Sequence, residues 1–337
     1  MNTGNPVMVE VTRGAIVESR HSGAAAIVRA DESVVAAWGD VERPVFPRST
    51  VKPLQALPLL ETGAADRLHV GDRELALACA SHNGEEEHVA TVAAWLDRLE
   101  LGPHDLVCGA HPPMSAQAAE SLVRTGEAPS PLHNNCSGKH AGFLTTAIFL
   151  REPTTGYGGS SHPVQLRVRQ VLSQFAAVEF RDDMIAVDGC SVPTFAMPLR
   201  SLALCMARLA DPSRFGRLRT EAIRRILAAM AAHPTLVAGR GRFDTMVLTA
   251  AGGAVVVKGG AEGVQCAVLP ELGLGIALKI DDGGKRAAET AMAGLLLAFA
   301  KPAEKLRWAL LPYLDLPLRN AAGTRVGATR VAPDWLS

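Results

Sequence analysis

The pattern of apolar and polar positions predicts strands near both ends of the chain and helices between them. Short β-type runs at residues 7–11, 25–28 and 34–38 alternate with turn-prone breaks, which is typical of an antiparallel meander. Helical spacing of apolar residues follows at residues 86–99, 116–124, 140–149, 164–175, 199–209 and 217–232. The first two thirds of the chain therefore read as a meander followed by a largely helical region.

The last third returns to strands and then ends in a helix. β-type runs fall at residues 244–249, 254–257, 264–268 and 275–279, and an apolar helix is expected at 284–300. A further buried strand is expected at residues 184–187, whereas residues 151–161 are rich in Gly, Thr and Ser and predict a loop or flexible joint. Strands at both ends indicate one sheet assembled from the two termini.

The predicted fold is α/β of the α+β kind, with an antiparallel sheet flanked by helices and an added helical region. We expect one domain over residues 1–337, in which residues 1–48 and 240–300 form the sheet. Residues 49–235 would form the helical region and carry most of the motifs described below.

Composition narrows the function classes. The 337 residues are 48% hydrophobic and 20% charged, enough to bury a large core, and 34 basic residues balance 34 acidic ones. This balance gives no support for binding nucleic acid or an anionic membrane. No run reaches transmembrane length, and the N-terminus lacks the basic cluster and apolar core of a signal peptide, so we expect a cytoplasmic protein. Six dispersed cysteines then predict free thiols or metal ligands.

Ser49 and Lys52 are the most informative pair in the chain. On a helix, positions three apart share a face, so the lysine nitrogen can reach the serine hydroxyl. Such a lysine can act as a base toward the serine and create a nucleophile for acyl transfer. The same spacing also arises by chance in a capped helix with a solvated lysine. Pro53 disfavours helical geometry at Lys52, which predicts a tight or distorted turn there.

Two further motifs extend this chemistry. The triplet Ser-His-Asn stands at residues 81–83, and Lys-Gly-Gly stands at 258–260 at the end of a β-type run. Acyl-serine enzymes need polar groups that relay protons and donors that hold an oxyanion. The order S-x-x-K, S-x-N, K-G-G resembles penicillin-binding proteins and serine β-lactamases, although their third motif has Ser or Thr where Gly259 stands here.

A fourth motif distinguishes the chain from the penicillin-recognising enzymes. They lack an element like Asn-Asn-Cys-Ser-Gly-Lys-His, which occupies residues 134–140, followed by Val-Asp-Gly-Cys at 187–190. Together with residues 48–53, 81–85 and 258–263, these blocks closely resemble the rhizobial-type, or class 3, L-asparaginases. The resemblance runs over essentially the whole chain.

The resemblance implies a fold similar to serine β-lactamases, penicillin-binding proteins and glutaminases. It also implies hydrolysis of L-asparagine to L-aspartate and ammonia, by a homodimer. Ser49 would be the nucleophile with Lys52 beside it, and Ser81 and Lys258 would form a second Ser–Lys pair.

The resemblance further implies a zinc ion held by Cys136, Lys139 and Cys190, with water completing the sphere. Thiolates suit zinc, but the chain has neither C-x-x-C nor H-E-x-x-H, so spacing alone would not predict this site. A lysine coordinates only as the neutral amine.

Three more residues would bind the substrate. By the same resemblance, Asp188 would hold the substrate ammonium group or the metal-bound water, and His140 and Arg48 would help to bind its carboxylates.

Alternatives to an asparaginase stay open on the sequence. They are a glutaminase or broader amidase, a penicillin-interactive acyl-serine protein, and a non-catalytic zinc-dependent module that senses asparagine. The cysteine and lysine cluster and the missing secretion signal argue against the penicillin alternative. The sequence also leaves open which lysine is the neutral base.

Overall fold

The structure is a computed structural model that describes residues 4–336. The chain forms two compact units, each made of segments that are distant in sequence. The first comprises Met1–Thr50, Met197–Asp211 and Thr249–Ser337, and the second comprises Val51–Ala196 and Pro212–Leu248.

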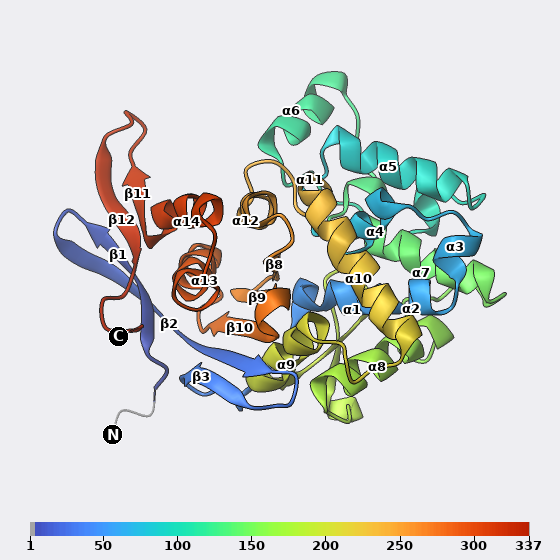
Figure 1. Cartoon of the computed structure of the whole chain (residues 1–337). Helices are drawn as coiled ribbons and strands as arrows, with labels where there is room; N and C mark the ends of the chain where they lie inside the picture. Colours follow the sequence, from blue (N-terminus) through green and yellow to red (C-terminus); the bar gives the residue numbers. More distant parts are fainter. Residues whose placement is uncertain (1–3, 337) are drawn as a thin grey trace. The chain divides into compact units, whose positions relative to one another are not determined.

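The first unit contains an eight-stranded sheet whose paired strands are all antiparallel. Its strands are β1 (Val7–Arg13), β2 (Ile16–Arg29), β3 (Val34–Trp38), β8 (Val256–Gly259), β9 (Val264–Leu269), β10 (Leu274–Ile280), β11 (Asp315–Arg319) and β12 (Arg325–Val331). The strand order is β11-β12-β1-β2-β10-β9-β8, and β3 pairs with β2 (Figure 1). The prediction of an antiparallel sheet built from both ends of the chain is confirmed, with β11 and β12 as additional strands that were not predicted.

Helices pack on this sheet. Helix α9 (Leu199–Ala210) contacts β2, β9 and β10, and α13 (Lys285–Phe299) contacts β1, β9, β10 and β12 (Figure 1). Gly275 in β10 permits the close approach of α9, because a Cβ atom there would lie 2.1 Å from the backbone nitrogen of Ala207. The remaining elements of this unit are β4 (Pro44–Val45), β7 (Met197–Pro198), η5 (Pro270–Leu272), α14 (Glu304–Leu310) and η6 (Leu311–Leu314).

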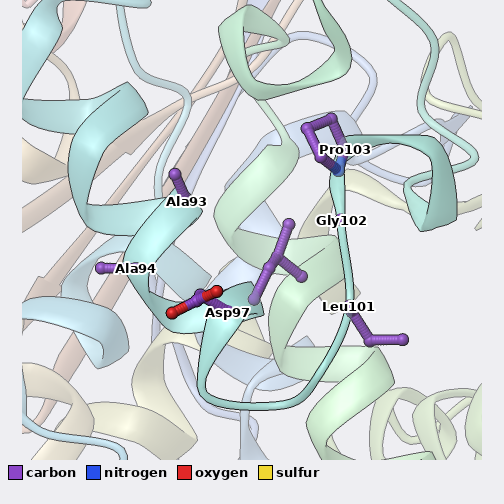
Figure 2. Close-up of a pocket in the computed structure, with 7 residues that line it drawn as sticks. Ala93, Ala94, Asp97, Leu101, Gly102 and Pro103 are labelled. Atoms are coloured by element: carbon purple, nitrogen blue, oxygen red, sulfur yellow. The ribbon is translucent and has the colours of Figure 1, made fainter.

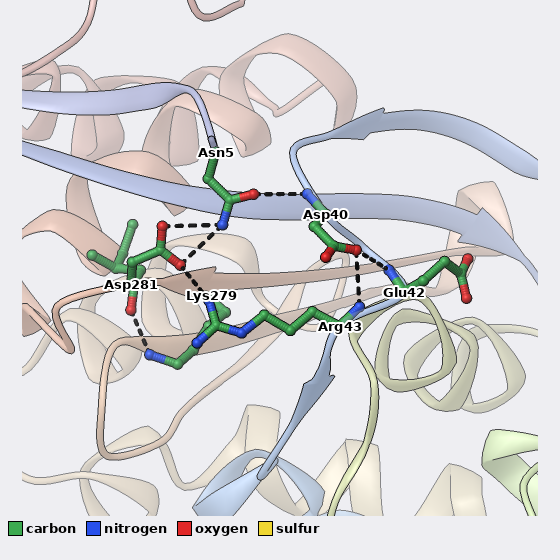
Figure 3. Close-up of polar contacts among 7 residues, drawn as sticks. Asn5, Asp40, Glu42, Arg43, Lys279 and Asp281 are labelled. Atoms are coloured by element: carbon green, nitrogen blue, oxygen red, sulfur yellow. Dashed lines mark hydrogen bonds and ion pairs between the residues drawn. The ribbon is translucent and has the colours of Figure 1, made fainter. Parts of the chain in front are cut away.

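A polar network fastens the segment before β1 to the turn between β10 and α13 (Figure 3). The amide of Asn5 donates to both carboxylate oxygens of Asp281, at 2.9 and 3.0 Å, and Arg43 Nη1 donates to the same carboxylate at 3.3 Å. The Asn5 side-chain oxygen accepts the backbone N–H of Asp40 at 2.7 Å. One asparagine therefore joins three segments of the first unit.

The second unit is mainly helical. Its helices are α1 (Lys52–Gln55), α2 (Leu57–Glu61), α3 (Ala64–Arg67), α4 (Asp72–Ala78), α5 (Glu86–Asp97), η2 (Pro103–Asp105), α6 (Ala116–Thr125), η3 (Pro131–His133), α7 (Ser137–Phe149), α8 (Pro163–Ala176), η4 (Asp182–Met184), α10 (Arg217–Ala232) and α11 (Pro234–Val237). All seven helices predicted from the apolar pattern are confirmed to within about three residues at each end, α9 and α13 in the first unit included. Helix α4 lies at the centre of this unit, in contact with α5, α7, α10 and α11.

Two predictions of strands need correction. Residues 244–249 lie in helix α12 (Phe243–Ala251), not in a strand. Phe243 and Val247 are buried at helical spacing, as are Asp244 and Leu248, and a short apolar run does not distinguish this pattern from a strand. The strand at 184–187 exists as β5 (Ile185–Val187) but is not buried, because within residues 4–336 it pairs only with β6 (Pro193–Phe195) and leaves Val187 78% exposed.

Two expectations from composition can be compared with the structure. All six cysteines are free and buried, as predicted for thiols that form no disulfides. In residues 4–336, no helix has the length and apolar character needed to cross a membrane.

Gly138 and Gly142 of α7 offer a matched test of the α4–α7 packing. A Cβ atom at Gly138 would lie 2.4 Å from the carbonyl oxygen of Leu77 in α4, whereas at Gly142 the nearest atom would be 3.5 Å away. We expect Gly138→Ala to lower the free energy of unfolding in urea by about 1–3 kcal/mol, through overpacking against backbone. Gly142→Ala should be neutral or stabilising by up to about 1 kcal/mol. Equal effects of the two substitutions would contradict this packing.

Candidate functional site

Lys52 is the centre of a buried polar cluster in the second unit. Its side chain is 1% exposed although it stands at the first position of α1. The Nζ atom donates to the carbonyl oxygen of Ala80, to Ser81 Oγ at 3.1 Å and to Cys136 Sγ at 3.2 Å. The structure thus brings together a lysine, a serine and a cysteine from three of the sequence motifs.

The loop that carries Ser81 is held by backbone contacts on both sides. It follows α4, and Ser81 N–H donates to Val237 O at 2.9 Å while His82 N–H donates to Asn135 O at 3.2 Å. Gly239 has a φ of +111°, and a Cβ atom there would lie 2.4 Å from Asn83 Nδ2. This position therefore requires glycine on both conformational and steric grounds.

The asparagine of the same motif is fixed by an arginine. Arg242 Nη1 donates to Asn83 Oδ1 at 2.8 Å, and Asn83 Nδ2 donates to Glu85 Oε1 at 3.0 Å. The Ser-His-Asn loop is consequently held by side-chain as well as backbone hydrogen bonds.

Cys136, Lys139 and Cys190 form a second cluster that adjoins the first through Cys136. Cys136 stands immediately before α7, and its backbone N–H donates to Asn134 Oδ1 at 2.9 Å. Lys139 Nζ donates to Cys190 Sγ at 2.9 Å, and the two thiols share a hydrogen bond. These three residues, which the resemblance grouped as zinc ligands, are brought together by the fold.

The pKa values of the two thiols in this cluster shift in opposite directions. A hydrogen bond from Cys190, together with the positive charges of Lys52 and Lys139, holds the pKa of the Cys136 thiol well below its usual value. Donation to Cys136 and burial raise the pKa of Cys190. Burial alone would lower the pKa of Lys139, but the thiols and Asp188 outweigh it and raise that pKa. The pair therefore holds one thiolate and one thiol beside an ammonium group.

The donor set fits a zinc ion in its chemistry. Two thiol sulfurs and one amine nitrogen are the N/S ligands that zinc takes, and three protein ligands leave a fourth position open. Within residues 4–336, no group of three or more His, Cys, Asp or Glu side chains is placed to hold a metal. A metal at this cluster would accordingly depend on Lys139 as the third ligand, in its neutral form.

Asp188 and Cys190 lie in the turn between β5 and β6. The carboxylate of Asp188 accepts the N–H of Gly189 at 2.8 Å, and its other oxygen lies 3.9 Å from Cys190 Sγ. Ser191 closes this turn with a φ of +69°, in the left-handed region. The hairpin therefore holds Asp188 at the edge of the thiol cluster.

His140 is fully buried on α7 beside Tyr157. Its Nδ1 atom lies 2.8 Å from Tyr157 Oη, which also accepts the backbone N–H of Val107 at 3.0 Å. Burial, assisted by the charges of Lys139 and Lys52, lowers the pKa of His140 well below its usual value. The ring is therefore neutral near pH 7.

The sequence did not single out Tyr157. It lies in the 151–161 stretch that predicted a loop, and the structure confirms turns there but leaves Tyr157 0% exposed. The one signal in the sequence is an isolated aromatic residue among glycines and threonines.

Arg48, Ser49 and Lys258 belong to the first unit. Arg48 and Ser49 open the turn η1 (Arg48–Val51), where Arg48 has a φ of +51°. Lys258 is the next-to-last residue of β8, is 2% exposed and donates from Nζ to Gly259 O at 2.7 Å.

Gly260 lies against the turn that carries Ser49. A Cβ atom at Gly260 would be 3.1 Å from Pro47 O and 3.2 Å from Thr50 Cγ2. The Lys-Gly-Gly motif and the Ser49 turn are thus neighbours, and glycine permits their backbones to approach.

His82 and His88 form a buried pair that the sequence did not reveal. Their rings stack with centroids 4.8 Å apart, and His82 Nε2 lies 2.9 Å from Ser137 Oγ while His88 Nε2 lies 2.8 Å from Thr235 O. Burial is the largest cause that lowers the pKa of both imidazoles, and for His82 the charges of His88 and Lys52 add to it. The native loop therefore needs both rings neutral.

A cavity of about 390 Å³ lies elsewhere in the second unit, against α5 (Figure 2). It is lined by Ala93, Ala94, Leu96, Asp97, Leu101, Gly102 and Pro103. Asp97 is its one ionisable side chain, and none of the residues predicted for catalysis lines it. The polar clusters around Lys52 and Cys136 are the better candidates for chemistry.

Nearly the whole chain, residues 9–331, matches the model of a family of enzymes that hydrolyse amides. That family is L-asparaginase II, and the chain belongs to it. The resemblance seen in the sequence is thereby confirmed at the level of the family. No curated protein sequence matches the chain.

Several solved structures are similar to this one at low sequence identity. A β-lactamase from Mycobacterium bovis is 14% identical with a TM-score of 0.46, over 82% of this chain and 94% of that one. The native form of a protein called Mglu is 15% identical with a TM-score of 0.46, over 82% and 64%. A putative β-lactamase from Bacteroides dorei is 13% identical with a TM-score of 0.40, over 78% and 85%.

The buried histidine pair predicts loss of stability in acid. Because folding lowers both pKa values, the unfolded chain takes up protons below about pH 6.5 that the folded chain does not. We expect the free energy of unfolding to fall as pH decreases below that value, by up to about 1.4 kcal/mol per pH unit for each histidine. Urea titrations between pH 7.5 and 5 would measure this slope. His88→Gln should reduce the slope, and an unchanged slope would contradict the role of the pair.

Proposed function

We propose that this protein hydrolyses the side-chain amide of L-asparagine to give L-aspartate and ammonia. Membership of the L-asparaginase II family supports an amide substrate. The observation that carries the proposal is the buried Lys52, which donates to Ser81 and Cys136 and so joins the serine and cysteine motifs in one cluster. A homodimer, as the resemblance implies, is part of the proposal.

In the proposed reaction, Ser49 attacks the side-chain amide carbon and forms a covalent aspartyl ester. The serine proton must leave as the bond forms, and Lys52, Ser81 and Lys258 are the groups we assign to accept and return it. The 3.1 Å contact between Lys52 Nζ and Ser81 Oγ is a path along which a proton can move. Protonation of the leaving nitrogen releases ammonia, and water then hydrolyses the ester.

Backbone N–H groups next to Ser49 are the donors we assign to the oxyanion. Backbone donors suit this task because they are fixed before the charge develops. Glycines at 259 and 260 leave the end of β8 without side chains that would obstruct the approach of a substrate.

Cys136, Lys139 and Cys190 are the residues that would hold a zinc ion. A bound zinc would supply a positive charge that attracts and orients the substrate, since a serine already provides the nucleophile. Asp188, at the edge of this cluster, is assigned to the substrate ammonium group, and His140 and Arg48 to its carboxylate. The carboxylate of Asp188 suits a substrate ammonium group. The imidazole of His140 and the guanidinium of Arg48 can donate hydrogen bonds to a substrate carboxylate.

Ammonia release from L-asparagine and, in parallel, from L-glutamine tests the reaction and the nucleophile together. The wild-type protein should release ammonia faster from asparagine, and Ser49→Ala should lower kcat by at least about three orders of magnitude. Its fold is checked by urea unfolding, which Ser49→Ala should leave nearly unchanged.

Other outcomes would reassign the function. Faster release from glutamine would indicate a glutaminase, and activity retained by Ser49→Ala would move the nucleophile elsewhere. Binding of asparagine without ammonia release would indicate a sensor, and covalent labelling of Ser49 by a fluorescent penicillin would indicate a penicillin-interactive protein.

Zinc content tests the thiol cluster independently of activity. We expect Cys136→Ser to lose most of the zinc that the purified wild-type protein retains after dialysis, because an alcohol is a poor zinc ligand compared with a thiolate. Cys205→Ser is the matched control, since Cys205 is a buried thiol on α9 outside the cluster. Equal zinc in both variants would refute the assignment.

A further inference from the structure

Tyr157 is the strongest feature that the proposed reaction does not use. It is one of only two tyrosines in the chain and is 0% exposed. Its hydroxyl lies between the backbone N–H of Val107, at 3.0 Å, and Nδ1 of His140, at 2.8 Å. A buried hydroxyl that lies between a backbone N–H donor and an imidazole nitrogen can determine which nitrogen of the imidazole carries the proton.

Counting protons decides the direction of the bond to His140. A backbone N–H can only donate, so Val107 gives its proton to Tyr157 Oη. The hydroxyl proton of Tyr157 can then be donated to His140 Nδ1, the neighbouring acceptor. If Nδ1 donated instead, the tyrosine proton would be left buried with no acceptor, which is costly. Tyr157 therefore donates to Nδ1, and the imidazole carries its own proton on Nε2.

The Nε2 atom of His140 is left without a partner by the contacts that the structure describes. It is buried and has no hydrogen-bond partner in the part of the chain that the structure describes. Such an orphaned donor is rare in native proteins unless a ligand or a water satisfies it. His140 Nε2 therefore presents one N–H that a bound oxygen atom could accept.

The direction of that N–H is fixed as well as its proton. Tyr157 and Phe143 pack edge-on against the imidazole, with centroid distances of 5.6 and 6.0 Å and interplanar angles of 73° and 65°. Two aromatic walls and one hydrogen bond leave the ring little freedom to rotate or flip. The imidazole of His140 is therefore held in one orientation, which sets the direction in which Nε2–H donates.

We propose that Tyr157 is a positioning residue that locks His140 in the Nε2–H tautomer, so that Nε2–H donates to a carboxylate oxygen of the amino-acid substrate. This inference rests on the proposed function for the identity of the ligand, but the tautomer follows from the contacts of Tyr157 alone. Tyr157 acts through His140 and does not touch the substrate.

Imidazole nitrogen NMR tests the lock directly. In protein labelled with ¹⁵N-histidine, long-range proton–nitrogen spectra distinguish a protonated from an unprotonated ring nitrogen, and His140→Gln identifies the His140 signals. The wild-type spectrum should show Nε2 protonated and Nδ1 unprotonated. Tyr157→Phe removes only the donating hydroxyl and should shift His140 toward a mixture of tautomers. Tyr313→Phe, at the other tyrosine, should leave the His140 signals unchanged.

Kinetics test the link to the substrate. Tyr157→Phe should raise KM for L-asparagine roughly ten-fold, the effect of weakening one hydrogen bond to a charged group, while kcat changes by less than about two-fold. Tyr313→Phe should change neither.

The outcomes separate this inference from the proposed function. A wild-type His140 protonated on Nδ1 would overturn the lock, and so would an unchanged tautomer in Tyr157→Phe. The wild-type spectrum decides this even if the variant does not fold. A shifted tautomer with an unchanged KM would overturn the role in substrate binding. A wild-type protein without amidase activity would refute the proposed function, while its spectrum would still decide the lock.

Discussion

The structure of the second unit depends on the burial of one lysine. A buried amine is costly unless its hydrogens are bonded, and Lys52 meets this requirement with a carbonyl oxygen, a hydroxyl and a cysteine sulfur. These acceptors come from the segment after α4 and from the residue before α7. The end of one helix and the start of another must therefore converge on α1. The motifs at residues 81–83 and 134–140 are thus joined by the hydrogen bonds of Lys52 as well as by apolar packing.

Two glycines make this convergence possible. Gly138 lets α7 approach the backbone of α4 at Leu77, and Gly239 lets the segment after α11 press against Asn83. In each case a methyl group would meet backbone or side-chain atoms at 2.4 Å, well inside any tolerable contact. The positions of Ser81 and Cys136 therefore depend on the absence of side chains elsewhere. Close contact between backbone segments brings the side chains of this polar cluster together. Their positions therefore depend on glycines that take no part in the chemistry of the cluster.

The sequence predicted the parts of the molecule whose signal is local. Apolar spacing found the long helices, alternation found most of the sheet, and a contiguous motif singled out Ser49 and Lys52 as candidates. The sequence pattern wrongly predicted a strand at α12, where a short apolar run occurs. It missed β11 and β12, whose mixed composition carries little pattern. It could not find Tyr157, Arg242 or the pairing of His82 with His88, because each acts through a partner that only the fold supplies. The proposal of Cys136, Lys139 and Cys190 as zinc ligands came from resemblance alone, since no spacing rule links Cys136 to Cys190.

The charges of the cluster bear on what it can bind. Lys52 and Lys139 are both buried beside the Cys136 thiol, whose pKa is lowered, and the Asp188 carboxylate also acts on Lys139. The cluster therefore holds basic and acidic groups close together, and interactions among such groups are stronger away from water than in water. The proposed Nε2–H of His140, buried and without a hydrogen-bond partner in residues 4–336, adds a neutral donor. A free amino acid brings a carboxylate, which a simple amide lacks. It also brings an ammonium group, so this mixture of basic and acidic groups supports the proposal of an amino-acid amide as the substrate.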